Sequence, residues 1–78
     1  MITRKQVRNL QMYKDVKHHV RSKSMFISIW MRPDIFFDNF APAEIIYQVT
    51  KIDGSGISSV KVSSPDEAWE KYKKAISL

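Results

Sequence analysis

Both glycines of the 78-residue chain lie in one four-residue segment, Asp53-Gly54-Ser55-Gly56. A run rich in β-branched residues and alternating in polarity stands on each side of it, residues 45–52 before and 57–62 after. Glycine supplies the positive φ that tight hairpin turns require, and Asp before Gly is a strong turn signal. Alternating polarity is typical of half-buried strands. The sequence therefore predicts a β-hairpin, one face of which holds Ile45, Tyr47, Val49, Val60 and Val62.

A helix is predicted directly after this hairpin. Ser64 is a favourable N-cap, Pro65 suits the first helical position, and Glu67 completes the spacing of a capping box. One apolar stripe at helical spacing follows, made of Ala68, Trp69, Tyr72, Ala75 and Ile76. Two of the three lysines of this helix, Lys71, Lys73 and Lys74, stand four residues after acids, in the pairs Glu67–Lys71 and Glu70–Lys74. We therefore interpret them as a charge-balanced solvent face rather than as a phosphate site.

Residues 3–21 contain neither glycine nor proline, and Gln6 follows Thr3 at capping-box spacing. At helical periodicity Leu10, Met12, Tyr13, Val16 and Val20 gather on one side. We expect a helix over residues 3–21 whose apolar side packs on the sheet. Its solvent side would carry Arg4, Arg8 and His18, flanked by Lys14, Lys17, Arg21 and Lys23.

Residues 24–32 predict a further strand. Its apolar face consists of Met25, Ile27, Ile29 and Met31. If both helices pack on that face, Phe26 and Trp30 are left on an open face beside Arg32. Aromatic side chains interleaved with a basic residue can stack nucleobases or anchor a protein partner. Coverage by a loop or a second subunit is an equally consistent interpretation.

An apolar segment lies between Pro33 and Pro42, and its large residues are Ile35, Phe36, Phe37 and Phe40. Such a loop either folds back on the core or projects as an interaction anchor. Folding back is favoured, because exposed phenylalanine clusters lower solubility.

The net charge is +5, and it is unevenly distributed. Residues 1–34 hold eight of the 13 lysines and arginines but only two of the eight acids. This asymmetry indicates an anionic partner at the N-terminal end of the chain.

Catalytic and metal-binding patterns are not found. The chain has no cysteine, and its two histidines, His18 and His19, are adjacent, whereas metal-binding pairs on a helix stand three or four residues apart. No serine stands in a nucleophile motif, and Gly54-Ser55-Gly56 lacks the lysine of a phosphate loop. We expect no enzyme activity, no cofactor and no metal. The longest apolar run, around residues 25–31, is far below the roughly 20 residues of a membrane span, so we expect a soluble, cytoplasmic protein.

The expected order of helix, three strands and helix resembles that of double-stranded-RNA-binding domains. In that family lysines at the start of the last helix grip phosphates, whereas Pro65-Asp66-Glu67 stands there in this chain and would repel them. The unit 45–76, with Ala68-Trp69 on its helix, is also similar to the three-stranded DNA-reading domains of phage-type integrases. Neither resemblance places the chain in a family.

The sequence thus predicts a single small α+β domain in α-β-β-β-α order. Its three-stranded, mainly antiparallel sheet would carry both helices on one face, and its uncovered edges make a homodimer plausible. The expected function is a small non-enzymatic module that binds nucleic acid through the basic face of the first helix, together with Arg32. The alternative is a protein-interaction or inhibitor protein of the kind found in phages and mobile elements, which would dock on an acidic or other protein partner. Its docking residues would be Trp30, Phe36, Phe37 and Phe40.

Overall fold

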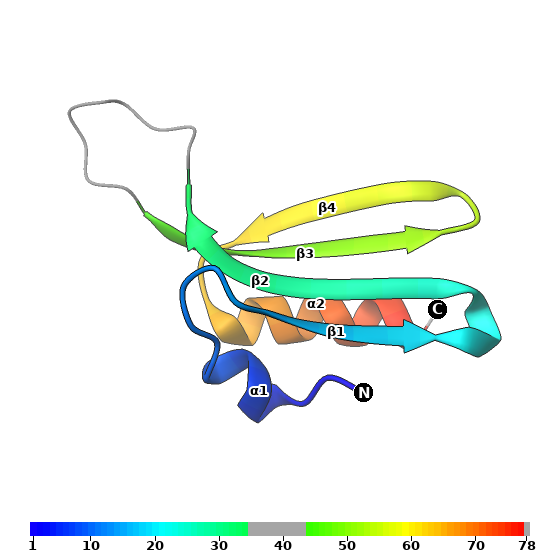
Figure 1. Ribbon diagram of the computed structural model, residues 1–78, viewed down its shortest axis with the longest axis horizontal. Helices are drawn as coiled ribbons and strands as arrows, with labels where there is room; N and C mark the ends of the chain where they lie inside the picture. Colours follow the sequence, from blue (N-terminus) through cyan, green and yellow to red (C-terminus); the bar gives the residue numbers. More distant parts are fainter. Residues whose placement is uncertain (35–43, 78) are drawn as a thin grey trace.

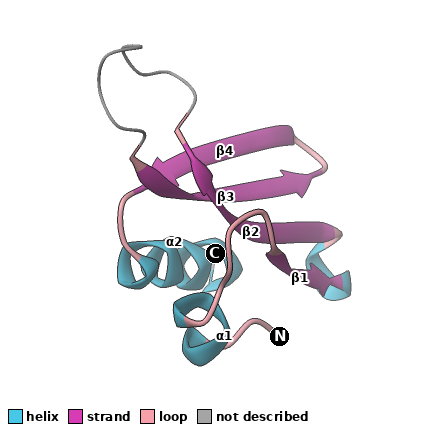
Figure 2. Ribbon diagram, turned by 60° about the vertical axis from the view of Figure 1, so that its left-hand side comes forward, coloured by secondary structure: helices cyan, strands magenta, loops and turns pink. Residues whose placement is uncertain are grey.

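The computed structural model describes residues 1–34 and 44–77. They form a four-stranded antiparallel sheet in the order β1-β2-β3-β4, together with two α-helices (Figure 1). The elements are α1 (Arg4–Arg8), β1 (Asp15–Val20), the 3-10 turn η1 (Arg21–Lys23), β2 (Met25–Pro33), β3 (Ile45–Asp53), β4 (Gly56–Val62) and α2 (Pro65–Ser77). Figure 2 shows both helices on the same side of the sheet. The expectation of a small α+β fold with an antiparallel sheet is confirmed, but the expected three strands are wrong, because the sheet has four.

The additional strand is β1, which forms in the second half of the helix expected over residues 3–21, and that expectation is wrong. The capping box is present, since Gln6 N donates to Thr3 Oγ1 (3.2 Å) and Thr3 N donates to Gln6 Oε1 (2.8 Å). Helix α1 nevertheless ends at Arg8, and Tyr13, with a φ of 63°, adopts a left-handed conformation that a right-handed helix cannot contain. From Asp15 onward, exposed and half-buried residues alternate as they do in a strand.

Strand β2 lies between β1 and β3 and supplies the centre of the core. The strand predicted over residues 24–32 is confirmed within a residue at each end. Met25, Ile27 and Ile29 are buried on the helix side, while Phe26 and Trp30 are half-buried on the other side. This alternation decides which side chains of the sheet remain available to a partner.

The predicted hairpin is confirmed. Val49 pairs with Val60 and Tyr47 with Val62, so these residues share a face. In the turn, Asp53 Oδ1 accepts hydrogen bonds from Ser55 N (2.9 Å) and Ser55 Oγ (2.6 Å). Gly56 has a φ of 125°, which side-chain-bearing residues rarely adopt.

Helix α2 packs against the sheet and covers the core. Its cap is the predicted one, because Glu67 N donates to Ser64 Oγ (3.2 Å). Ala68 and Tyr72 are fully buried, whereas Trp69, in the same stripe, is only partly buried. The core cluster consists of Ile2, Val7, Met25, Ile27, Ile29, Tyr47, Val49, Ala68 and Tyr72.

Candidate functional site

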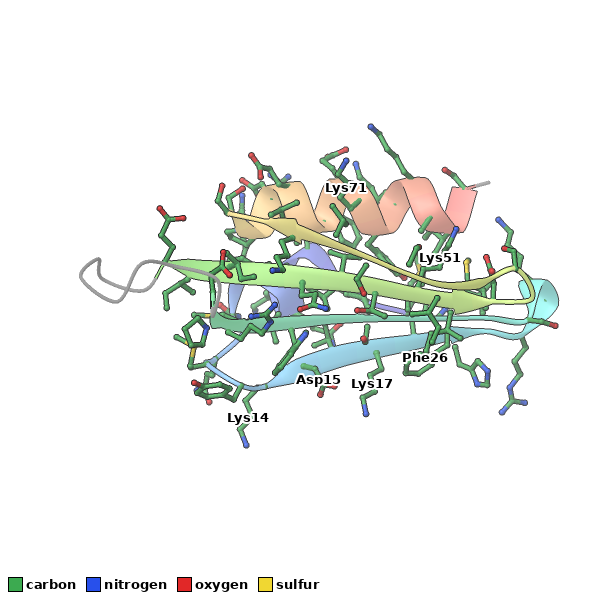
Figure 3. The ribbon with its side chains drawn as sticks, turned by 90° about the horizontal axis from the view of Figure 1, so that it is seen from above. Lys14, Asp15, Lys17, Phe26, Lys51 and Lys71 are labelled. Atoms are coloured by element: carbon green, nitrogen blue, oxygen red, sulfur yellow. The ribbon has the colours of Figure 1, made fainter. Side chains whose placement is uncertain are left out.

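The sheet has one face on which the structure, over residues 1–34 and 44–77, places no helix (Figure 2). We call it the open face. Strand register aligns its side chains in rows across the sheet. The rows are His19, Phe26, Ile52 and Ile57; then Lys17, Ser28, Thr50 and Ser59; then Asp15, Trp30, Gln48 and Lys61. Figure 3 shows Lys14, Asp15 and Lys17 extending from the side of the sheet away from α2.

A hollow of about 330 Å³ opens on this face where β1 begins. It is lined by Tyr13, Trp30, Arg32, Pro33 and Gln48. The guanidinium carbon of Arg32 lies 5.6 Å from the centroid of the Trp30 ring, within cation–π range. The hollow therefore combines aromatic surface with a fixed positive charge.

Arg32 is held in place by its neighbours and is only 8% exposed. Its Nε donates to Gln48 Oε1 (2.8 Å) and its Nη1 donates to the carbonyl oxygen of Pro33 (2.9 Å). Because arginine only donates, the Gln48 oxygen must face it, which leaves the Gln48 amide NH₂ as a further donor. Both Arg32 and Gln48 line the hollow. The hollow thus presents donors to an acceptor-rich ligand.

Tyr13 forms one wall of the hollow from an unusual backbone position. Its N–H donates to the carbonyl oxygen of Met31 (2.7 Å), and its side chain is 66% exposed. A bulky residue at a positive φ carries a conformational cost, which persists only where surrounding contacts impose it, and such residues cluster at functional sites. The consequence here is a third aromatic ring at the edge of the open face.

The charges of the open face are balanced by weak ion pairs. Lys17 Nζ lies 3.6 Å from Asp15 Oδ2, and Lys61 Nζ lies 3.7 Å from Asp34 Oδ1. An exposed pair such as Lys17–Asp15 contributes little to stability. Aromatic surface and hydrogen-bond donors, rather than excess charge, distinguish this face.

The predicted basic helix face does not form as a unit. Arg4 and Arg8 lie on α1, but both contact Asp66 of α2, with nitrogen–oxygen distances of 3.1 and 3.3 Å. The hydrogen bond from Arg4, together with both guanidinium charges, lowers the pKa of Asp66 below its ordinary value. These arginines tie the two helices together.

His18 and His19, predicted on the same helix, lie on opposite faces of β1. His18 points to the helix side, where its Nδ1 lies 2.7 Å from Tyr72 Oη. Burial, with help from the positive charges of the Met1 amino group and His19, lowers the pKa of His18. His19 is exposed and packs edge-on to Phe26 at a centroid distance of 6.0 Å. Only His19 therefore belongs to the open face.

The remaining predicted residues are dispersed. Arg21 and Lys23 lie in η1 at the far end of β1 from Lys14, and Lys23 Nζ donates to the carbonyl oxygen of Ile76. Phe36, Phe37 and Phe40 lie outside the described residues. The structure thus brings together Trp30, Arg32, Lys14 and Lys17 on one side, with Phe26 on the face where the sequence places it, and adds Tyr13 and Gln48 to them. Gln48 could be found from strand alternation, but nothing in the sequence marks the φ of Tyr13.

Residues 1–34 and 44–77 contain no group of three or more His, Cys, Asp or Glu side chains placed to hold a metal. In the same residues, no helix has the length and apolarity needed to cross a membrane. Comparison of the chain with protein-family models, curated proteins and solved structures finds no match.

Proposed function

We propose that the chain is a small non-enzymatic module that binds single-stranded nucleic acid through the open face. The observation that carries this proposal is the grouping of Tyr13, Phe26 and Trp30 at the surface of one sheet face, with Arg32 fixed beside Trp30. Aromatic platforms within a basic setting are how proteins bind unpaired bases with little sequence preference.

Unpaired bases suit this face better than a duplex. Rings on a sheet can stack only on bases whose own faces are free, and paired bases stack on one another. Phe26 and Trp30 stand four residues apart on β2, about 13 Å at the rise of a strand. A single strand laid across the sheet can therefore reach both rings, while Lys14 and Lys17 at the β1 side contact its phosphates.

The N-terminal helix has no part in this binding. Its two arginines are engaged by Asp66, and the helix has five residues. We assign the phosphate contacts instead to lysines of the open face. Because these lysines are few and about one counterion is released per phosphate contacted, the affinity should depend only modestly on salt concentration.

The test is a titration of fluorescein-labelled single strands and duplexes with the protein at low salt. Each stacked ring contributes about 1–3 kcal/mol, so Trp30→Ala should weaken single-strand binding roughly 5- to 150-fold. Ile57→Ala is the matched control, because Ile57 is 73% exposed on the same face and has no ring. Thermal melting of each variant establishes that it is folded. A parent protein that binds no single strand at low salt, or equal affinities for the two variants, refutes the proposal.

A protein partner is the second candidate, and a different feature favours it. Strand β4 pairs only with β3, so its outer edge is unpaired in the described residues, and Ile52 and Ile57 are 39% and 73% exposed beside it. An extended segment of an acidic or other protein, or of a second copy, could add to this edge. A stoichiometric protein that stays bound in high salt, with no affinity for nucleic acid, would favour this candidate.

A further inference from the structure

A second hollow, of about 290 Å³, lies on the helix side of the sheet, between the β3–β4 hairpin and α2. Lys51 of β3 lines it together with Lys71 and Lys74 of α2, and the Ser58 side chain lies at the β4 side. We call it the lysine groove. Figure 3 shows Lys51 and Lys71 on the side of the sheet that α2 covers, opposite Lys17. The groove shares no lining residue with the hollow of the open face.

The groove exists because α2 does not cover β4 fully. The helix-side positions of β4 opposite it hold Ser58 and Val60, and Val60 is 38% exposed. The facing residue of α2 is Ala75, which is too small to fill the space. Val49 and Ala75 leave an apolar floor, and the lysine side chains border it.

The charges of the groove are not balanced in the way the sequence predicts. The expected partners Glu67 and Glu70 are engaged elsewhere: Glu67 Oε2 accepts from Ser63 N (3.3 Å), and Glu70 Oε1 pairs with Lys73 (3.0 Å). Among the described residues, Lys71 and Lys74 have no acidic partner, and none of the residues lining the groove is acidic. Lys51 alone has one, Asp53 at 3.5 Å.

Helix electrostatics explains part of this arrangement. A lysine in the last turn interacts favourably with the helix dipole, which accounts for Lys74. It does not account for Lys51, which lines the groove from β3. An anion in the groove would be attracted by lysines from both elements.

We propose that the lysine groove binds a phosphate group. Lysine holds phosphate as a compact point charge, and the Ser58 hydroxyl can donate a hydrogen bond to a phosphate oxygen. The phosphate belongs either to a free polyphosphate or to the backbone of a nucleic acid strand that passes round β4, the edge strand between the two faces. Either source requires the same lysines, and neither requires Trp30.

The test uses two probes on ¹⁵N-labelled protein at low salt: inorganic tripolyphosphate and an abasic single strand that carries sugar and phosphate but no base. The variant Lys71→Gln with Lys74→Gln should weaken binding about tenfold or more, since charge-assisted contacts are lost. The matched control is Lys5→Gln with Lys73→Gln, which removes the same charge at exposed sites that line neither the groove nor the hollow of the open face. Amide shifts on binding should centre on Ser58, Lys71 and Ala75.

The two probes distinguish a free polyphosphate from a nucleic acid backbone as the source of the phosphate. Loss of tripolyphosphate binding in the groove variant assigns a free polyphosphate, and loss confined to the abasic strand assigns a nucleic acid backbone. Equal losses in groove and control variants would show charge attraction without a site and overturn the proposal, as would absence of shifts with both probes. Trp30→Ala must leave tripolyphosphate binding unchanged, so failure of the open-face proposal is distinguishable from failure of this one.

Discussion

The substitution Tyr72→Phe removes a single hydroxyl group and tests how much that group stabilises the fold. The Tyr72 ring is fully buried, and its Oη accepts a hydrogen bond from Ile2 N (3.1 Å) and lies 2.7 Å from His18 Nδ1. Whichever tautomer His18 adopts, the bond to Nδ1 requires the Tyr72 hydroxyl, either as its donor or as its acceptor. The substitution leaves both partners unsatisfied without changing the shape of the core.

The magnitude follows from the two lost bonds. A buried N–H without an acceptor costs about 1–3 kcal/mol, and the bond to the half-buried His18 contributes about 0.5–1.5 kcal/mol. We therefore expect Tyr72→Phe to lower the free energy of unfolding by about 2–4 kcal/mol. A chain of 78 residues typically has about 4–12 kcal/mol in total, so the variant should retain only part of its stability.

Urea unfolding followed by far-ultraviolet circular dichroism measures this loss. With a slope of about 1 kcal/mol per molar urea, the midpoint should fall by about 2 M or more. Tyr13→Phe is the control, since the Tyr13 side chain is 66% exposed and no side-chain hydrogen bond is recorded for it; its change should stay within about 0.5 kcal/mol. A Tyr72→Phe variant as stable as this control would refute the role given to the hydroxyl.

Two further perturbations have matched controls within the chain. The folded-state pKa of His18 is lowered from 6.5, so the unfolded chain binds more protons just below that pH; stability is full above pH 6.5 and declines as the pH falls towards the folded-state pKa. His18→Gln should abolish this decline in urea midpoint and His19→Gln should retain it, whereas a decline that survives His18→Gln contradicts the assignment. Gly56→Ala should lower the free energy of unfolding by about 1–3 kcal/mol because Gly56 has a φ of 125°. Gly54→Ala, where an added Cβ meets open space, should cost less, and a reversed order in calorimetric melting would refute the strain argument.

Elements specified by local chemistry are predictable from this sequence. The hairpin follows from the two glycines and the Asp53 side chain, and α2 follows from Ser64 and Glu67, all within a few residues of the backbone that they organise. Strand β2 follows from strict alternation in Met25–Pro33. In each case the local preference and the tertiary contacts agree.

Strand β1 could not be predicted in this way, because its sequence fits two periods. Val16 and Val20 are spaced for a helix, and Val16, His18 and Val20 are equally spaced for a strand. Pairing with β2 selects the strand over the helix. This pairing joins two segments of the chain, so the sequence of β1 alone does not contain it. The pairing of Arg4 with Asp66, 62 residues apart, is equally invisible in the sequence, and it removes Arg4 from the expected binding surface.

Strand alternation predicts the residues that β2 contributes to the open face, whereas the position of Tyr13 depends on backbone geometry. Phe26, Trp30 and Arg32 were expected together from their spacing alone. Tyr13 joins them only because the chain reverses at a positive φ before β1. The ion pairs predicted for Lys71 and Lys74 are not among those of the described residues for a related reason, since Glu67 and Glu70 have competing partners that a one-dimensional pairing rule does not contain.

The bond between Ile2 and Tyr72 joins residues 70 positions apart, and it has a consequence for biosynthesis. A ribosome adds about 5–20 residues per second, so the first residues wait for several seconds before their partner is made. During that interval Met25, Ile27 and Ile29 lack α2, which supplies Ala68 and Tyr72 to the same core. Native topology can be completed only after release of α2 from the exit tunnel, so this chain must fold largely after translation of its own domain rather than during it.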